Sequence, residues 1–359
     1  MKYPEFKKYS SIENITREKT LMQIHKMGFD ADDVLWTVNE KFHGSNFSLI
    51  LKRDENSDIQ IIPGKRSSVL DPNDNFFSYR RALTEDLKSE LVRCFQLFEA
   101  FGNMTSMQWY GEIVGGLYDA EGVERIPGAT RVQKEVQYHP DNKIVFYDCV
   151  VQNGDSRLML DQDFLEDIFA KNIKSGYFAK SLFTGTFHEA VEFSKKTYDQ
   201  PTLAPQIWDL PEIEGNIREG NVLKPVIPKF FSCGSRVILK HKNETFKERH
   251  VKIRQKKKDI QSNFSPETMK LVSVLDEFIT ENRLNAVLSK IGDNLTHKDF
   301  GKILHDMFED IIEDFKKEEE EMVNLLEQNY KTVSKLTKSN VAIFIRERFI
   351  NIIDRSKSV

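Results

Sequence analysis

The spacing of the apolar residues changes at Asn243, and this change constrains the fold more than any other feature of the 359-residue chain. Before Asn243, short runs rich in β-branched and aromatic residues alternate with helical patterns, as in an α+β fold. After it, apolar residues recur every three or four positions, which is typical of amphipathic helices in a small bundle. Ser265 and Pro266 have the residue types of a helix N-cap and a first helical position. We therefore expect three parts: an α+β domain over residues 1–243, a basic linker over 244–265 and a helical domain over 266–359.

One short segment, Glu40–Asn46, has the composition of a phosphate-binding turn that carries a nucleophile. It lies between strand-like runs at residues 36–38 and 47–51, so we expect a turn between two strands. Lys41 is the candidate nucleophile, because an amine set among other cations loses its proton readily and can then attack phosphorus. The structural alternative is a strand turn with a solvated lysine, and the four fixed residues of K-x-H-G-x-N are too few to exclude it.

Three neighbours of Lys41 favour the ligand-binding interpretation. Gly44 lets the backbone approach a bulky ligand closely. His43 and Asn46 can form hydrogen bonds with phosphate or sugar oxygens. The segment is therefore a candidate site for a phosphate ester.

Charged residues also interrupt strand-like apolar runs later in the chain. Glu112 lies inside the apolar run 107–116, and Glu219 begins the run 219–225. A carboxylate in such a place is costly unless it is paired or faces a ligand. Other candidate residues in or beside strand-like runs are Arg66 at the end of the run 59–66, the pair Tyr147 and Asp148, and Lys224. Lys240 and Lys242 are a further pair, and their spacing of two places them on one face of a strand.

The strongest charge asymmetry lies between Lys224 and Lys258, where twelve Lys and Arg residues accompany two Glu residues. Such a segment is the electrostatic pattern expected of nucleic-acid contact, although the net charge of −4 argues against a general polyanion binder. For the run 256–258, a solvated linker is the alternative. The compensating acids lie in the stretch 306–321, which we expect to be one helix whose charged run 316–321 is a solvated face.

Composition adds limits on the class of protein. A hydrophobic content of 39% and a charged content of 30% are those of an ordinary soluble protein. No apolar run approaches the roughly 20 residues that cross a bilayer, and the amino terminus has no apolar signal core. Cys94, Cys149 and Cys233 are too far apart for a disulfide framework or a metal set. We expect a cytoplasmic protein without a membrane segment.

Taken in order, these segments resemble the double-stranded (nick-sealing) RNA ligase family of T-even bacteriophages, of the RNA ligase 2 type. This family is related to the kinetoplastid RNA-editing ligases and belongs to the covalent nucleotidyltransferase superfamily. The resemblance covers nearly the whole chain, and the order of its motifs is more specific than any one of them. The matching stretches are FKKYSSIEN, EKFHGSNFSL, KR before a later FF-x-Y, YGEIVGG, VQKEVQY, VFYD, EGNVLKP, RVILKHKN, and NRLNAVLSKIG followed by KDFGK.

The resemblance implies a role for each matching residue around ATP or AMP. Lys41 matches the lysine that is adenylylated, and Glu40 matches a residue that helps to recognise adenine. Arg66 and Glu112 match the residues that hold the ribose hydroxyls. Tyr147 stands where the phage enzyme has a phenylalanine that stacks on adenine. The other matches are His43 and Asn46 along the phosphate and ribose, Glu219 with its divalent metal, Lys224 on the same strand, and Lys240 and Lys242 at the ATP phosphates.

The resemblance also implies an activity and its partners. We expect an N-terminal adenylyltransferase domain of antiparallel sheets with flanking helices, followed by a helical domain that engages RNA. The implied enzyme is monomeric, uses ATP with Mg²⁺ or Mn²⁺, and seals 3′-hydroxyl/5′-phosphate nicks in duplex RNA or an RNA–DNA hybrid, in RNA repair or editing. The tail from Glu321 to Val359 departs from the family pattern. The alternatives are an mRNA capping guanylyltransferase or DNA ligase of the same superfamily, and a non-catalytic RNA-binding module.

Overall fold

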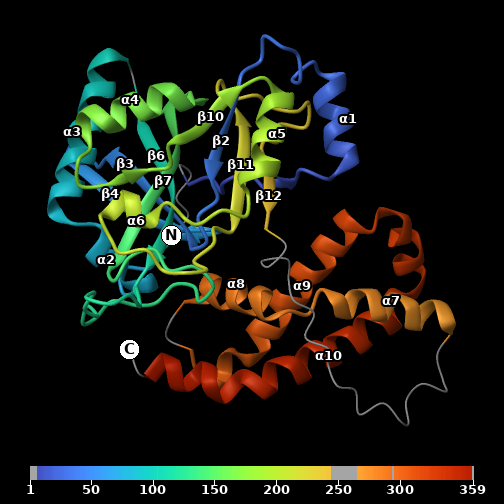
Figure 1. The fold of residues 1–359 in the computed structure, drawn as a ribbon. Helices are drawn as coiled ribbons and strands as arrows, with labels where there is room; N and C mark the ends of the chain where they lie inside the picture. The colour runs from blue at the N-terminus through green and yellow to red at the C-terminus, as the bar shows by residue number, and fades with distance from the viewer. Residues whose placement is uncertain (1–5, 103, 244–264, 293–294, 358–359) are drawn as a thin grey trace. The chain divides into compact units, whose positions relative to one another are not determined.

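A computed structural model describes residues 6–102, 104–243, 265–292 and 295–357. The chain divides into two compact units, Met1–Glu244 and Thr245–Val359 (Figure 1), which we call the N-terminal unit and the helical unit. The expected linker lies outside the described residues except for Ser265. The fold is α+β, with mostly antiparallel sheets in the first unit and helices in the second.

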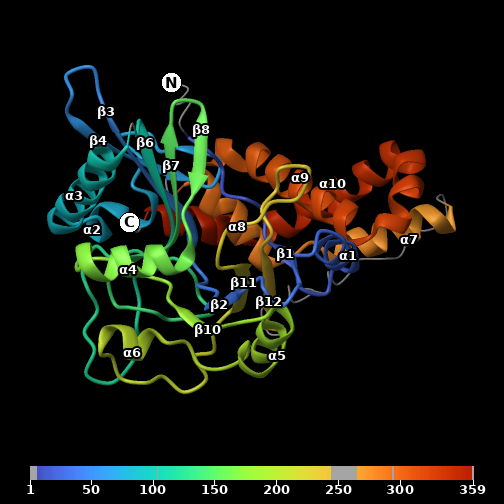
Figure 2. The ribbon, with the colours of Figure 1, turned by 90° about the horizontal axis from the view of Figure 1, so that it is seen from above.

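The strands of the N-terminal unit form two sheets. The five-stranded sheet has the order β1-β12-β11-β2-β10, with only β1 and β12 parallel. Its strands are β1 (Glu13–Asn14), β2 (Trp36–Glu40), β10 (Ser181–Gly185), β11 (Gly220–Pro225) and β12 (Leu239–Lys242). Figure 2 shows β2, β11 and β12 next to one another.

The second sheet has seven strands in the order β5-β4-β3-β6-β7-β8, with β9 paired to β7 in parallel. The strands are β3 (Ser45–Arg53), β4 (Ile59–Lys65), β5 (Ser68–Val69), β6 (Ser106–Gly115), β7 (Asn142–Asn153), β8 (Ser156–Met159) and β9 (Tyr177–Phe178). Two long strands, β6 and β7, pair over ten positions at its centre. This length gives the sheet a rigid middle from which side chains can be positioned accurately.

Helices cover each sheet on the side of its apolar residues. Helices α3 (Glu85–Phe101) and α4 (Gln162–Asn172) bury Leu91, Phe95 and Phe169 against the seven-stranded sheet. Helices α1 (Glu18–Lys26) and α5 (Phe187–Thr197) bury Ile24 and Ala190 against the five-stranded sheet. Two short helices, α2 (Tyr79–Ala82) and α6 (Ala204–Trp208), complete the unit. Helices therefore alternate with strands before Asn243, as expected.

A third apolar cluster joins the two sheets. Tyr9, Tyr110 and Ile238 are buried together, with Tyr147 and Val222 packed against them. Tyr110 and Tyr147 belong to the seven-stranded sheet, whereas Val222 belongs to the five-stranded sheet. We call this set the intersheet cluster. It fixes the spacing of the two sheets beside residues that the sequence singles out.

The described part of the helical unit contains four α-helices around one apolar core: α7 (Pro266–Glu277), α8 (Glu281–Ile291), α9 (Phe300–Glu318) and α10 (Val323–Lys357). The hydroxyl of Ser265 accepts a hydrogen bond from the backbone N–H of Thr268, and Pro266 is the first helical residue, as expected. Leu275, Phe308 and Phe344 are fully or almost fully buried in this core.

One expected boundary is wrong. The acidic stretch 306–321 is not one helix, because α9 ends at Glu318 and a short turn precedes α10. Negative side chains are unfavourable at a helix C-terminus, and four glutamates follow one another from Glu318. Strand β12 begins at Leu239, and before it the backbone of Arg236 forms an isolated bridge with Phe230.

No helix among the described residues is long and apolar enough to cross a membrane. All three cysteines are free, with Cys94 and Cys149 buried and Cys233 exposed.

Candidate functional site

The segment that carries Lys41 connects the two sheets. Strand β2 ends at Glu40 in the five-stranded sheet, and β3 begins at Ser45 in the seven-stranded sheet. The turn between two strands is therefore confirmed, but it is a crossover and not a hairpin. The backbone N–H of Lys41 donates to the carbonyl of Gly220, 2.9 Å away, and so continues the pairing of β2 with β11. Lys41 is held as rigidly as a strand residue.

Gly44 has a packing role in this crossover. A Cβ atom at this position would lie 2.1 Å from the carbonyl oxygen of Ile113 on β6. Only glycine fits there. The close approach expected of Gly44 is thus an approach to the backbone of the protein, where the sequence had suggested a ligand.

The amine of Lys41 is part of a half-buried charge cluster centred on Glu219. Its Nζ atom donates to Oε2 of Glu219 at 2.6 Å, and Nδ1 of His43 lies 3.4 Å from the same oxygen. Nζ of Lys242 lies 3.2 Å from the other carboxylate oxygen. Burial alone would raise the pKa of Glu219, but the three neighbouring cationic groups hold it well below its usual range. Glu219 is therefore an ionised carboxylate, only 5% of whose side chain is exposed.

A loop between β6 and β7 holds the crossover from one side. The hydroxyl of Tyr138 accepts a hydrogen bond from the backbone N–H of His43 at 2.7 Å, and Gln133 donates to the carbonyl of Gly44 at 2.9 Å. A carboxylate oxygen of Glu135 lies 3.1 Å from Nε2 of His43. Burial lowers the pKa of His43, but the carboxylates of Glu219 and Glu135 more than offset this and raise it above the usual value.

Sequence reasoning did not single out Gln133, Glu135 or Tyr138. They lie in the stretch VQKEVQY, which has no strand or helix pattern, and only the matching motif order marked it. Periodicity gives no signal for a loop whose importance comes from its contacts.

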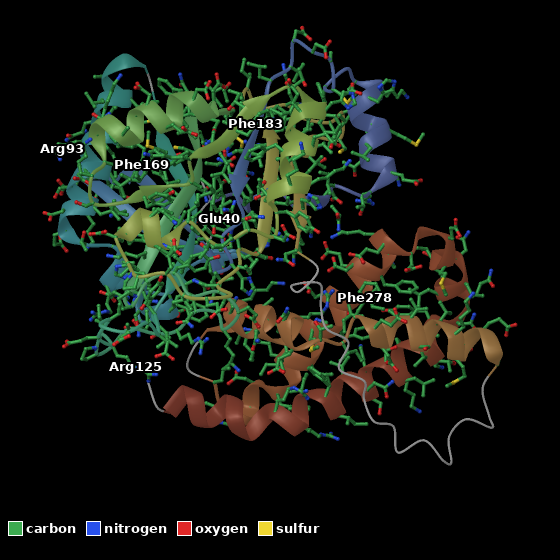
Figure 3. All side chains as sticks on the ribbon, in the orientation of Figure 1. Glu40, Arg93, Arg125, Phe169, Phe183 and Phe278 are labelled. Carbon is green, nitrogen blue, oxygen red and sulfur yellow. The ribbon has the colours of Figure 1, made fainter. Side chains whose placement is uncertain are left out.

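Glu40 is buried on the other side of the crossover. Its carboxylate accepts hydrogen bonds from the hydroxyl of Thr202 at 2.5 Å and the backbone N–H of Leu203 at 2.9 Å. Figure 3 shows Glu40 inside the N-terminal unit, whereas Arg93 lies at its periphery. Burial raises the pKa of Glu40, and the nearby charge of Arg218 and these two hydrogen bonds only partly offset the effect. The carboxylate thus ties β2 to the segment that precedes α6.

The seven-stranded sheet contributes a second group of candidates. Asn46 on β3 pairs with Glu112 on β6 in the register of the sheet, and its amide donates to the hydroxyl of Tyr147 on β7 at 2.6 Å. Arg66 follows the end of β4 and is half-buried. Burial and the negative charge of Glu219 raise the pKa of Glu112 to about 7, against the opposing effect of Lys41, His43 and Arg66. Glu112 therefore lies close enough to Arg66 and to the charge cluster around Glu219 for their charges to shift its pKa.

A buried ion-pair network lies behind Tyr147. The carboxylate of Asp148 accepts hydrogen bonds from Lys224 at 2.9 Å, from Arg236 and from the hydroxyl of Tyr9. Lys224 also donates to the backbone carbonyl of Tyr147 at 2.8 Å, and the rings of Tyr9 and Tyr147 meet edge to face with centroids 5.0 Å apart. Burial lowers the pKa of Lys224 to about 8, although Asp148 favours its charged form. We call Asp148, Lys224, Arg236 and Tyr9 the buried clasp.

The buried clasp changes the interpretation of two residues in the basic segment. Lys224 and Arg236 are 3% and 2% exposed, so they add nothing to a basic surface. Their charges neutralise Asp148 and link β7 of one sheet to β11 and the approach to β12 of the other. The nucleic-acid contact expected of the whole segment is not tested at the positions beyond Asn243, which lie outside the described residues.

The candidates are divided between the two sheets. Six candidates lie on or beside strands of the five-stranded sheet: Glu40 ends β2 and Lys41 follows it, Glu219 precedes β11 and Lys224 lies on it, and Lys240 and Lys242 lie on β12. Asn46, Arg66, Glu112 and Tyr147 lie on or beside strands of the seven-stranded sheet. Lys240 is half-buried and pairs with Val222 of β11 through the register of its strand. The crossover at Lys41 joins the two sets.

Comparison with known proteins gives matches to both units. A family model described as RNA ligase matches residues 34–242, and one described as T4 RNA ligase 2 C-terminal matches residues 261–342. RNA-editing ligase 1, mitochondrial, of Trypanosoma brucei brucei is 25% identical over 334 residues, covering 80% of this chain and 70% of the relative. RNA-editing ligase 2, mitochondrial, of the same organism is 23% identical over 363 residues, covering 88% of this chain and 84% of the relative.

Solved structures with a similar fold include an RNA ligase of Naegleria gruberi in its apo form, with 15% identity and a TM-score of 0.45. The match covers 68% of this chain and 58% of that one, so the chain spans less than two thirds of the solved protein. Another structure of the Naegleria gruberi ligase, with ATP and Mn, matches with 15% identity, a TM-score of 0.44 and the same coverage.

The match to residue 342 corrects one expectation. The tail was expected to depart from the family pattern from Glu321 onward, but the C-terminal family model continues through α10 as far as Ala342.

Proposed function

The chain belongs to the RNA ligase family of the covalent nucleotidyltransferase superfamily; from this premise we propose that it is an ATP-dependent RNA ligase that seals nicks in duplex RNA through a covalent Lys41–AMP intermediate. The single observation that supports this most directly is the position of the Lys41 amine, 2.6 Å from a buried ionised carboxylate in a crossover held by backbone hydrogen bonds. An amine fixed in this way needs little further ordering before it attacks.

Because the candidate residues are divided between the two sheets, we propose that each sheet acts on a different part of ATP. We propose that the seven-stranded sheet binds the nucleoside, with Arg66 and Glu112 at the ribose hydroxyls and Tyr147 against adenine. Tyr147 is half-buried and braced by Asn46 and Tyr9, which suits a stacking surface. We propose that Asn46 and His43 line the ribose and phosphate, and that Glu40 supports adenine recognition through the segment it binds.

The five-stranded sheet then supplies the reacting groups. Once its ammonium has lost a proton to solvent, Lys41 attacks the α-phosphorus of ATP through Nζ. The bond to the bridging oxygen breaks, pyrophosphate leaves, and loss of a second proton from Nζ gives the phosphoramidate with AMP. Lys240 and Lys242 neutralise charge on the phosphates. Lys224 acts indirectly, because its ammonium already donates hydrogen bonds to the carboxylate of Asp148 and to the backbone carbonyl of Tyr147.

A divalent cation fits this site only as part of a complex with nucleotide. Among the described residues, no group of three or more His, Cys, Asp or Glu side chains is arranged to hold a metal. Mg²⁺ is commonly bound by one or two carboxylates together with substrate phosphates, and the ionised carboxylate of Glu219 fits that requirement. We propose Glu219 as the protein ligand for Mg²⁺ or Mn²⁺, and the ion would stabilise negative charge on the transferring phosphoryl group.

Two further transfers complete the proposed reaction. AMP passes from Lys41 to an RNA 5′-phosphate, and the neighbouring 3′-hydroxyl then attacks that phosphate and expels AMP. A nick in a duplex holds both ends in place, which removes much of the entropic cost of joining them. We propose that the N-terminal unit forms Lys41–AMP, that the helical unit holds the duplex, and that the enzyme acts as a monomer.

The test is a comparison of Lys41→Ala with Lys26→Ala, which changes an exposed lysine at the end of α1. With radiolabelled ATP, Lys41→Ala should form no covalent AMP and should not seal a 5′-phosphate nick, yet should seal some pre-adenylylated nick. Lys26→Ala should behave as wild type. Labelling by GTP in place of ATP would indicate a capping enzyme, and preferential sealing of all-DNA nicks would indicate a DNA ligase. Covalent AMP on Lys41→Ala at wild-type level would refute the proposal.

A further inference from the structure

Helix α10 carries a stripe of four exposed cations. Lys331, Lys335, Lys338 and Arg346 are all exposed, at spacings of four, three and eight residues. At about 100° of rotation per residue, these spacings place them within one narrow sector of the helix. A rise of about 1.5 Å per residue makes the stripe roughly 22 Å long. We call these four residues the α10 stripe.

The stripe lies on the side of α10 that faces away from the core. The buried residues Val333, Thr337, Val341 and Phe344 fall in a different sector of the same helix and pack against α7 and α9. From Gln328 to Arg346 the sequence contains no Asp or Glu. From Gln328 to Arg346 the exposed face of α10 therefore carries positive charge without intervening acids.

The charges of the stripe are not neutralised by neighbouring side chains in the part of the chain that the structure describes. No carboxylate there lies within ion-pair distance of Lys331, Lys335, Lys338 or Arg346. On α9, by contrast, Lys317 pairs with Glu313 at 2.7 Å, and Asp310 pairs with Arg283 and Lys290. The four cations of the α10 stripe are thus available to a ligand.

Two members of the stripe are held in place by aromatic rings. The ammonium of Lys338 lies 4.4 Å from the ring centroid of Phe308, and the guanidinium of Arg346 lies 5.6 Å from that of Phe300. Such contacts restrict long side chains that would otherwise lose more conformational freedom on binding. Lys338 and Arg346 are therefore partly ordered before any ligand arrives.

We infer that the α10 stripe binds the phosphate backbone of duplex RNA. This inference rests on the function proposed above and assigns the binding of RNA to one surface of the helical unit. A rigid row of cations without acids between them matches a polyanion, whereas a partner protein would need matching carboxylates. The hydroxyl of Ser339, also exposed, can add a hydrogen bond to a phosphate oxygen. Contacts of this kind fix the position of the duplex without reading its sequence.

The test uses the full-length protein and removes charge at two positions whose stems do not pack on a ring. The variant is Lys331→Gln with Lys335→Gln, and the matched control is Lys302→Gln with Lys316→Gln, which removes the same charge from exposed positions on α9. Binding of a nicked RNA duplex is measured from 50 to 200 mM salt, and Lys41–AMP formation is measured separately with ATP.

The stripe variant should bind duplex RNA roughly tenfold more weakly or worse at 0.1 M salt, and the slope of log affinity against log salt should fall by about two. The control should stay within about twofold of wild type, and all three proteins should form Lys41–AMP equally. Equal binding by the stripe variant, or an equal loss in the control, would overturn the inference. If wild type formed no Lys41–AMP but bound duplex RNA through the stripe, the proposed reaction would fail and the binding surface would stand.

Discussion

Three cationic side chains of the N-terminal unit and the four of the α10 stripe differ in whether they contact a carboxylate. Lys41, Lys224 and Arg236 contact carboxylates whose side chains are 5% exposed or less. The four cations of the α10 stripe are exposed and have no carboxylate partner in the described part of the chain. Within the helical unit, buried Arg283, paired with Asp310 and Asp314, follows the pattern of the N-terminal unit.

This difference separates charges that fix geometry from charges that attract a ligand. A buried charge whose partner is removed cannot be rescued by water, so its loss should be large and nearly independent of salt. An exposed charge is hydrated and screened, so each one should contribute little to folding and its effect on binding should vanish at high salt. Substitutions of buried and exposed charges should therefore differ in the size of their effects and in their dependence on salt.

The largest effect is expected for Glu219→Ala. The change removes the partner of Lys41, His43 and Lys242 together with the proposed ligand of the divalent ion, so turnover at saturating ATP should fall by about three orders of magnitude or more. The fold should persist, because the apolar cores are untouched. Steady-state sealing rates and circular dichroism would check both statements, and full turnover at ordinary Mg²⁺ would make Glu219 merely structural.

Asp148→Asn should have the largest effect on stability. It leaves Lys224 and Arg236 buried without a counter-charge, which costs about 3–5 kcal/mol of unfolding free energy. Urea denaturation at low and high salt would measure the loss, and we expect the same value in both. A loss that disappeared in high salt would contradict the assignment of Asp148 to a dry interior.

Glu112→Gln should change the dependence of stability on pH. The pKa of Glu112 is raised from its usual range to about 7, so the folded state binds this proton more tightly than the unfolded state. Its contribution to stability is complete below about pH 4 and is lost as pH rises through 7. Between pH 5 and pH 8, the free energy of unfolding of the variant should therefore rise by about 2 kcal/mol relative to that of wild type. Urea unfolding at the two pH values tests this, and a constant difference would exclude it.

The smallest effect is expected for Asp167→Asn, which breaks an exposed pair with Lys171. The two side chains are 2.7 Å apart, slightly closer than Lys224 and Asp148, but they are 55% and 69% exposed. The expected change is at most about 0.5 kcal/mol, and it should shrink further in salt. A cost close to that of Asp148→Asn would remove the basis of the comparison, because distance and not burial would then decide the effect.

The sequence predicts the elements of this protein well. The strand that leads to Lys41, the strand carrying Glu112 and the N-cap at Ser265 lie where local pattern places them. These features are local, because they depend on spacing and on the residue types of a few neighbouring positions.

Features that depend on contacts between distant segments are missing from the sequence prediction. Nothing local shows that β2 and β3 belong to different sheets, or that Lys224 is buried against Asp148, 76 positions earlier in the chain. A lysine in a basic segment has the same local pattern whether it faces solvent or a buried carboxylate. The contacts of Glu135 and Tyr138 with the Lys41 crossover are equally invisible, since they come from a loop without periodicity.

The crossover between the two sheets has a kinetic consequence. If the nucleoside is bound by one sheet and the attacking amine is mounted on the other, a small sliding of the sheets changes the attack distance while leaving the nucleotide contacts intact. The intersheet cluster would then set that distance through the volume of Tyr110, Ile238 and Val222. Packing between the sheets would thus control turnover independently of ATP affinity. In an evolving lineage, the optimum temperature of this ligase could shift through core residues alone, with every residue that touches ATP unchanged.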